Sequence, residues 1–238
     1  MSPTTDELAA LHLEALYRYD AAGHVLRVNA QIAAPRVHLF RTPIGNHWRF
    51  GDGCADAIRP ALEAALGREP QLADCAELER RPPALETLRA LLAQQAPPAN
   101  EYRGPAFAFP DVIPPQAGAA AVEVVAVPQR LEAAGRLAWI REATDDERPL
   151  VVARDERGEV VAVCHSARTS ALAAEAGVET AEASRRRGHG IAVVVAWAEA
   201  VRAGGRVPLY STSWGNAASR ALARRLGLIC YGEDTHID

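Results

Sequence analysis

A short segment rich in arginine and glycine carries the strongest chemical signal in the sequence. Arg185–Arg187 stand directly before Gly188, His189 and Gly190. The glycines let the backbone approach a ligand closely and adopt a positive φ. A helix that begins here would offer unbonded N–H groups and a partial positive charge, which together bind anions. Because three like charges at a helix N-terminus reduce stability, the arginines predict an anionic ligand such as a pyrophosphate.

The same segment excludes two familiar nucleotide motifs. It has no Gly-Lys-Ser/Thr sequence, so it is not a Walker loop, and it lacks the third glycine of the dinucleotide-binding motif G-x-G-x-x-G. A Gly-x-Gly after a strand is also typical of a plain tight turn, which is the alternative reading. The elements on either side of the segment are therefore needed to distinguish a ligand-binding loop from a plain turn.

The second half of the chain, residues 119–238, has the regular pattern of an α/β (α+β) domain. Short apolar runs predict strands, and longer periodic segments predict helices. We expect strands near 121–127, 150–154, 159–168, 174–180, 207–213 and 228–237, with helices near 129–141, 190–203 and 217–226. Hairpin connections come first and helical crossovers come later, which predicts a mixed sheet. The arginine–glycine segment lies between the fourth strand and the second helix.

Two motifs in this half resemble the GNAT superfamily of acyl-CoA-dependent N-acyltransferases. The family signature R/Q-x-x-G-x-G/A after a strand is matched by Arg185–Gly190. The second feature is a strand, then an asparagine and a helix, matched by Asn216 and by the helix that closes at Leu226–Leu228. The resemblance covers residues 119–238. It implies a GNAT-like mixed, mostly antiparallel sheet flanked by helices, with acetyl-CoA as co-substrate and no metal.

The resemblance also assigns residues to the cofactor. In the family, backbone groups of the strand contact the pantetheine, and the loop holds the pyrophosphate. The cofactor-binding residues implied in this way are Val178, Thr180, Arg185, Arg186, Arg187, Gly188, His189, Gly190, Ile191, Asn216 and Ser219. For Asn216 a second interpretation is equally good, because asparagine directly before a helix is a favourable N-cap.

The implied reaction is transfer of an acetyl group from acetyl-CoA to a primary amine by direct attack in a ternary complex. Acetyl is expected only because it is the usual acyl group of the family. The amine must first lose a proton, and the family often places a glutamate on the strand before the loop. We therefore predict Glu175 as the general base. Both Glu175 and Glu179 have an alternative interpretation as solvated strand residues, and His165 is a further candidate.

One position departs from the family. Many members carry a tyrosine on the helix after the asparagine as general acid for the leaving thiolate, and the matching residue here is Ala223. Either another group protonates the thiolate or the thiolate leaves unassisted. Tyr210, Ser213 and Tyr231 are candidates for that group. The departure keeps open a non-catalytic acyl-CoA-binding regulatory module, and a nucleotide-binding enzyme is a third hypothesis.

The first half, residues 1–118, contains no assignable motif. Its pattern predicts helices near 6–19, near 54–66 and between the proline pairs at 82–83 and 97–98, with strands near 25–28, 36–41 and 47–50. We expect an additional N-terminal α/β domain, set off by the proline-rich segment 113–118. This domain would contribute to the acceptor site or form a dimer interface. Its cluster Arg41, His47, Trp48 and Arg49 suits either an anionic acceptor or an exposed strand face with one core tryptophan.

Composition narrows the partners and the location. The net charge of -4 argues against a nucleic-acid partner, because phosphate binding needs a concentrated basic surface. The polar start is unlike a signal peptide, and the apolar runs fall far short of the roughly 18 residues of a membrane span. The four cysteines lack metal-ligand spacing, so we expect reduced thiols. These features predict a cytoplasmic protein with an amine-bearing acceptor (a small molecule rather than a protein), no membrane partner, and homodimerisation as an option.

Overall fold

The computed structural model describes residues 3–21, 25–28, 33–114, 121–133 and 135–238. The chain forms two compact units. Unit 1 comprises Met1–Ala108, Ser211–Arg220 and Ile229–Asp238, and unit 2 comprises Phe109–Tyr210 and Ala221–Leu228. The predicted boundary at 118 lies outside the described residues. The units do not coincide with residues 1–118 and 119–238, because the C-terminal strand packs with the first half of the chain.

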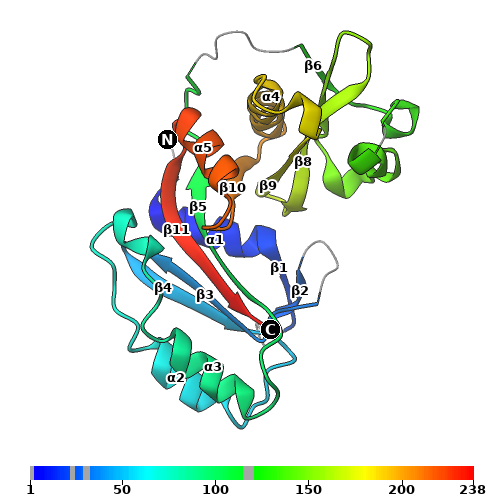
Figure 1. The fold of residues 1–238 in the computed structure, drawn as a ribbon. Coiled ribbons are helices and arrows are strands. Elements are labelled where there is room, and N and C mark those ends of the chain that lie inside the picture. The colour runs from blue at the N-terminus through cyan, green and yellow to red at the C-terminus, as the bar shows by residue number, and fades with distance from the viewer. Residues whose placement is uncertain (1–2, 22–24, 29–32, 115–120, 134) are drawn as a thin grey trace. The chain divides into compact units, whose positions relative to one another are not determined.

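Unit 1 is built on a four-stranded antiparallel sheet (Figure 1). Its strands stand in the order β4-β3-β11-β5, so the last strand of the chain lies between two strands of the first half. β1 and β2 form a separate antiparallel pair. The elements are α1 (Thr5–Leu16), β1 (Tyr17–Tyr19), β2 (Val25–Val28), β3 (Val37–Thr42), β4 (Gly45–Phe50), α2 (Arg59–Leu66), a 3-10 turn η1 (Cys75–Glu79), α3 (Leu85–Ala93), β5 (Glu101–Ala108) and β11 (Ile229–Ile237).

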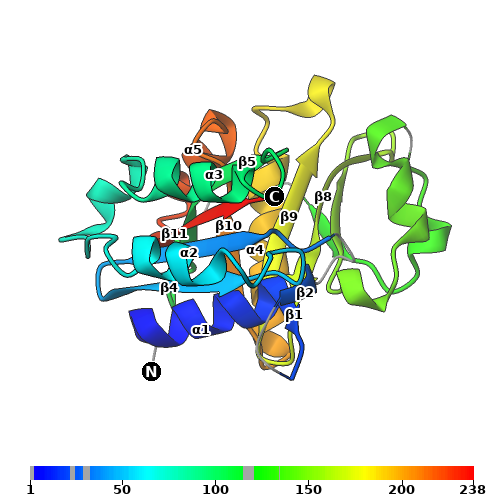
Figure 2. The ribbon, with the colours of Figure 1, turned by 90° about the horizontal axis from the view of Figure 1, so that it is seen from below.

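Helices cover both faces of this sheet. Leu85, Leu88 and Leu92 recur at helical spacing, so α3 presents one apolar stripe. That stripe packs with α2 against the face of β3 that carries Val37 and Leu39. Successive strand residues point to opposite faces, and His38 and Phe40 accordingly face α1. Figure 2 shows α1 on one side of β3 and α3 on the other.

A buried ion network holds β11 in unit 1. The Glu233 carboxylate accepts a hydrogen bond from Arg41 Nε at 2.8 Å, another from Arg103 and a third from Trp214 Nε1 at 2.8 Å. Arg41 also donates to the carbonyl oxygens of Leu78, within η1, and of Arg80, which directly follows η1. Arg41 is 1% exposed and its guanidinium is engaged by these groups, so Arg41 is neither on an exposed strand face nor available to an acceptor. An acceptor role for His47, Trp48 and Arg49 stays a prediction.

The opposite face of β11 carries a second buried polar cluster. Asp234 accepts hydrogen bonds from His12 Nε2 and His38 Nε2, both at 2.7 Å. His12 Nδ1 lies 2.9 Å from the Tyr231 hydroxyl oxygen, within hydrogen-bonding distance. The His12 ring stacks on Phe40, with centroids 4.6 Å apart. The two clusters together anchor β11 by polar contacts on both of its faces.

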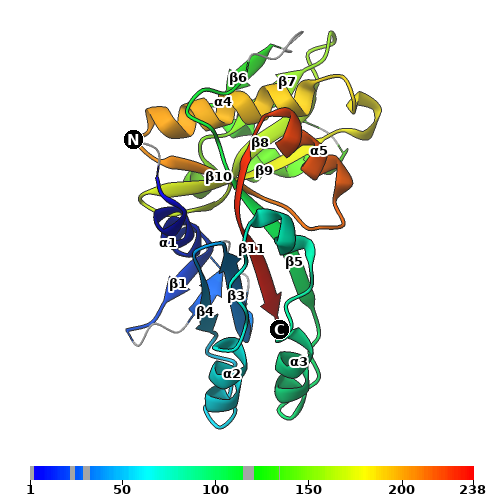
Figure 3. The same cartoon turned by 90° about the vertical axis from the view of Figure 1, so that its left-hand side faces the viewer.

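Unit 2 is a five-stranded sheet in the order β10-β9-β8-β7-β6. Its neighbours are antiparallel except β9 and β10, which run parallel because α4 connects them. Figure 3 shows α4 lying along β7 and β8, and it also contacts β9. The elements are β6 (Val122–Val124), η2 (Pro128–Arg130), η3 (Gly135–Glu142), η4 (Asp145–Glu147), β7 (Val151–Arg154), β8 (Val160–Thr169), β9 (Ala173–Thr180), η5 (Glu182–Ser184), α4 (His189–Ala203), β10 (Val207–Ser211) and α5 (Ala217–Arg225).

The predicted mixed, mostly antiparallel sheet flanked by helices is confirmed, with three local differences. The predicted helix 129–141 consists of the 3-10 turns η2 and η3, because Gly135 adopts a φ of 59° that an α-helix does not allow. Strand β5 was not expected, since Pro105 interrupts its pattern. The first helix ends at Leu16, three residues short, because the aromatic segment Tyr17–Tyr19 pairs as β1 instead. Within the described residues, no helix is long and apolar enough to cross a membrane.

Candidate cofactor-binding and catalytic site

The arginine–glycine segment forms the turn between β9 and α4, as predicted. Gly188 is the N-cap of α4 and adopts a φ of 87°, and no side chain caps the helix. Arg186 has a φ of 62°, which costs a residue with a Cβ about 1–2 kcal/mol. The three arginine side chains are exposed. The turn therefore leaves the first N–H groups of a four-turn helix without a capping side chain, beside three cationic groups.

The end of β9 packs against the first turn of α4. A Cβ placed on Gly190 would lie 3.1 Å from Thr180 Oγ1, which is closer than most side chains approach. Gly190 thus permits the close contact between strand and helix that brings the backbone of both to one place. His189 and Ile191 occupy the same turn and are half-buried.

β9 and β10 separate beside this turn. The two strands pair over three residues only, from Ala173↔Val207 to Glu175↔Leu209. β9 continues to Thr180, and from Ala176 onward the strand pairing described for it is with β8 alone. An edge of this kind presents backbone N–H and C=O groups to a ligand. The structure therefore brings Val178, Thr180 and the predicted loop residues together within unit 2.

Two predicted cofactor residues lie in unit 1 instead. The Asn216 side-chain oxygen accepts a hydrogen bond from the backbone N–H of Ser219 at 3.0 Å. This is the geometry of an N-cap for α5. The capping interpretation of Asn216 is therefore confirmed, while contact of Asn216 or Ser219 with a cofactor stays a prediction.

Glu175, the predicted general base, lies on β9 where β10 begins to diverge. Its side chain is 2% exposed, and its Oε2 accepts a hydrogen bond from Arg168 Nη1 at 2.9 Å. The interpretation of Glu175 as a solvated strand residue is therefore wrong. The ion pair gives this carboxylate a structural role, and its part in proton transfer stays a prediction.

The candidates for the general acid have different surroundings. Tyr210 is buried on β10, and Ser213 is half-buried in the connection that leads to α5. The Tyr231 hydroxyl is engaged by His12 in unit 1. Ala223, at the position where the family carries tyrosine, is fully buried in α5, so its own side chain supplies no proton.

A group of polar side chains lies on one face of β8 and β9. The sequence pointed to His165 and Glu179 in this group but not to Trp139 or Arg136. The His165 ring on β8 lies over Gly177, its register partner on β9, and a Cβ at Gly177 would lie 2.4 Å from His165 Cε1. The Trp139 ring of η3 packs edge-on against His165, with centroids 4.7 Å apart. The detectable signal was the glycine inside a strand, which often marks close approach of another group.

This group also holds Glu179 in place. Its two carboxylate oxygens accept hydrogen bonds from Trp139 Nε1 at 3.2 Å and Arg136 Nε at 3.1 Å. Burial lowers the pKa of His165, so the ring is neutral at neutral pH. Its Nδ1 atom is buried without a hydrogen-bond partner among the described residues. His165 is therefore chemically able to accept a proton.

No metal site is found among the described residues. None of them form a group of three or more His, Cys, Asp or Glu side chains that could hold a metal ion.

Comparison with known proteins gives one family match. Residues 151–236 match the family described as FR47-like protein, which is related to the GNAT superfamily. No curated protein matches the chain.

Several solved structures are similar to this one at low sequence identity. A putative GNAT acetyltransferase from Novosphingobium aromaticivorans is 18% identical, with a TM-score of 0.45 over 59% of this chain and 65% of its own. A GNAT-family acetyltransferase from Colwellia psychrerythraea is 12% identical, with a TM-score of 0.48 over 81% and 76%. A GCN5-related N-acetyltransferase-like protein from Streptococcus suis is 14% identical, with a TM-score of 0.45 over 86% and 85%. The chain thus spans just under two thirds of the Novosphingobium protein. The predicted GNAT resemblance is confirmed for residues 151–236, which match this GNAT-related family model.

Proposed function

We propose that the protein transfers an acetyl group from acetyl-CoA to a primary amine. The observation that supports this most directly is the separation of β9 and β10 beside a helix that begins at Gly188. Acetyl-CoA is a thioester with a long polar arm and a pyrophosphate, and each of these two groups has a suitable binding surface here. Its arm pairs with the open edge of β9, and its pyrophosphate accepts from the N–H groups of α4.

The arginines add charge where the pyrophosphate would bind. Arg185 and Arg187 flank Arg186, whose positive φ is a strained conformation that usually persists only where function requires it. Guanidinium groups bind phosphate oxygens through two parallel hydrogen bonds. Together with the Gly188 cap, they favour a diphosphate over a neutral ligand.

The chemistry is direct attack by a neutral amine. The protonated acceptor amine first gives a proton to Glu175 or to the neutral imidazole of His165. The amine nitrogen then bonds to the thioester carbonyl carbon, and N–H groups on the open edge of β9 stabilise the oxyanion. The nitrogen of this adduct then gives its extra proton to solvent, and collapse breaks the carbon–sulfur bond, forms the amide and releases the CoA thiolate. Tyr210 or Ser213 would protonate that thiolate, or it leaves unassisted, since Ala223 carries no acid.

The test is acetyl-CoA consumption by the full chain against a panel of small primary amines, with CoA release followed by liquid chromatography. Release that depends on an amine, together with an acetylated amine in the mass spectrum, supports the proposal. Tight binding of acetyl-CoA with no turnover for any amine would instead favour a second candidate, a non-catalytic acyl-CoA-binding module. The buried Ala223 at the family's tyrosine position is the observation behind that candidate.

The acceptor class follows from the same reasoning. A small amine is proposed rather than a protein side chain, and unit 1 is proposed to contribute to acceptor binding or to a homodimer. Turnover of free amines but not of lysine-containing peptides is the expected pattern. Efficient acetylation of peptides alone would contradict the choice of a small acceptor.

A further inference from the structure

Two cysteines that are far apart in the sequence meet in unit 1. Cys75 is the first residue of η1, and Cys230 is the second residue of β11. The Cys75 thiol lies 3.1 Å from the backbone carbonyl oxygen of Cys230. Both side chains are half-buried and therefore partly accessible to small molecules, whereas Cys54 and Cys164 are buried.

The two thiols are also chemically unequal. Contact with Cys230 lowers the pKa of Cys75, against the opposing effects of its burial and of Asp74. The same contact raises the pKa of Cys230, and burial adds to this rise. The thiolate form is the nucleophile in thiol chemistry. Cys75 is therefore the attacking sulfur, and Cys230 stands beside it as a resolving thiol.

We propose that Cys75 and Cys230 form an oxidisable dithiol site whose co-reactant is a hydroperoxide. The Cys75 thiolate attacks the terminal peroxide oxygen, the O–O bond breaks, and one molecule of water or alcohol leaves, which makes Cys75 a sulfenic acid. The Cys230 sulfur then attacks the Cys75 sulfur. The S–O bond breaks, the hydroxide takes the Cys230 proton and leaves as water, and a disulfide remains. The two thiols lose two electrons in total, and the peroxide gains them.

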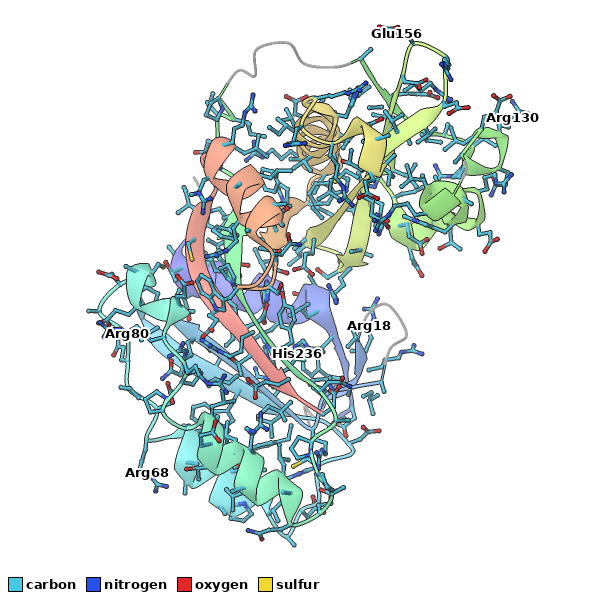
Figure 4. The ribbon with its side chains drawn as sticks, viewed as in Figure 1. Arg18, Arg68, Arg80, Arg130, Glu156 and His236 are labelled. Carbon is cyan, nitrogen blue, oxygen red and sulfur yellow. The ribbon has the colours of Figure 1, made fainter. Side chains whose placement is uncertain are left out.

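The disulfide would join η1 to β11, two elements that are already linked through Arg41. Arg41 binds the carbonyl oxygens of Leu78 and Arg80 at the far end of η1, and it also binds Glu233 on β11. Arg80 follows η1 directly and is labelled in Figure 4. A covalent bond at Cys75 would therefore tie the opposite end of η1 to the start of β11. The result is a cross-link across the strand that completes the sheet of unit 1.

The test is oxidation of the folded full chain by one equivalent of hydrogen peroxide, followed by alkylation and peptide mass mapping. The expected product is a single disulfide between the peptides that contain Cys75 and Cys230, reversible by dithiothreitol. Cys230→Ser should instead accumulate a sulfenic acid at Cys75, trapped by dimedone. Cys75→Ser should leave Cys230 largely unmodified. Cys54→Ser is the matched control and should form the same disulfide as the unmodified chain.

A second measurement does not depend on any variant. Phenylarsine oxide bridges two adjacent thiols, so the native chain should bind one equivalent and become protected from peroxide. The proposal is overturned if peroxide modifies the two cysteines independently without joining them. It is also overturned if Cys75 reacts no faster than the buried Cys54, or if the arsenical fails to bind the native chain.

Discussion

The imidazole of His165 lies over the backbone of Gly177, so that the side chain of one strand takes the space that a side chain of the next would fill. This arrangement places a neutral, largely buried base on the face of β9 that also carries Glu175 and Glu179. It makes the identity of residue 177 decisive for the position of His165. Its consequences can be measured separately for stability and for turnover.

Gly177→Ala should therefore destabilise the fold. A Cβ 2.4 Å from His165 Cε1 forces the ring to move, and overpacking of this kind costs about 1–3 kcal/mol. Urea unfolding monitored by tryptophan fluorescence measures the loss. Gly45→Ala is the matched control, because Gly45 also lies in a strand and its Cβ would meet no atom within 4 Å. Equal stability of the two variants would show that the His165 ring moves freely.

Gly188→Ala should weaken acetyl-CoA binding, measured by isothermal titration calorimetry. The substitution strains a residue at φ 87° and alters the backbone that would bind the pyrophosphate. Gly205→Ala provides the control, since Gly205 adopts a φ of 75° just beyond the other end of α4 and its Cβ would meet open space. Both variants should lose about 1–2 kcal/mol of stability, but only Gly188→Ala should lose affinity. Unchanged affinity in a folded Gly188→Ala chain would contradict the pyrophosphate assignment.

Glu175→Gln should lower kcat by roughly 10²-fold, as is usual when a general base is lost. It should also remove the acidic limb of the pH–rate profile and leave acetyl-CoA affinity unchanged. Glutamine can still accept a hydrogen bond from Arg168, so the fold is retained. Glu179→Gln serves as the control on the same strand. If Glu175→Gln keeps both turnover and the acidic limb, the base lies elsewhere, and His165→Asn becomes the decisive variant.

Acid should destabilise unit 1 in two steps. Burial lowers the pKa of His38, outweighing its hydrogen bond to Asp234, so below about pH 6.5 only the unfolded chain takes up that proton and stability falls. Burial alone would raise the pKa of Asp234, but His12 and His38 outweigh it and lower this pKa. The stability due to Asp234 is therefore present above about pH 3.9 and is lost as pH falls through its folded pKa.

Urea unfolding at a series of pH values checks this account. His38→Gln keeps a donor for Asp234 and should flatten the decline below about pH 6.5. His47→Gln is the control, at a half-buried histidine whose Nε2 lies 3.9 Å from Asp6 Oδ1, and it should leave the decline unchanged. A decline of equal steepness in His38→Gln would assign the acid sensitivity to other groups.

Asn216→Ala should cost about 1 kcal/mol of stability, because it removes the cap that receives the Ser219 N–H. Asn216→Ser retains a capping oxygen and should restore most of that loss. The Michaelis constant for acetyl-CoA should stay the same in both variants. A raised constant at unchanged stability would instead assign Asn216 to the cofactor.

Local sequence predicted the strand–helix junction of the candidate site well. The positions of Gly188 and Gly190 at a strand–helix junction follow from glycine chemistry and from hydrophobic period, and both are properties of a few adjacent residues. The N-cap at Asn216 is equally local. These features needed no knowledge of the rest of the chain.

Long-range pairing was beyond local sequence. The contact of Arg41 with Glu233 joins residues 192 positions apart, and no local period reveals it. Strand β5 contains Pro105 and owes its existence to pairing with β11, which overrides its weak propensity. Local sequence likewise could not decide between the two interpretations of Glu175, because its ion-pair partner Arg168 lies on another strand beside a bulge in β8.

The central position of β11 in unit 1 also bears on how the protein is made. Residues 229–237 lie between β3 and β5, which are synthesised more than a hundred residues earlier. Until β11 has been made, those two strands have exposed edges and no strand between them. Unit 1 can therefore complete its sheet only late in synthesis, through contacts of high sequence separation, which form slowly. Loss of β11 would damage the sheet formed by the first half of the chain more than the segment just before β11.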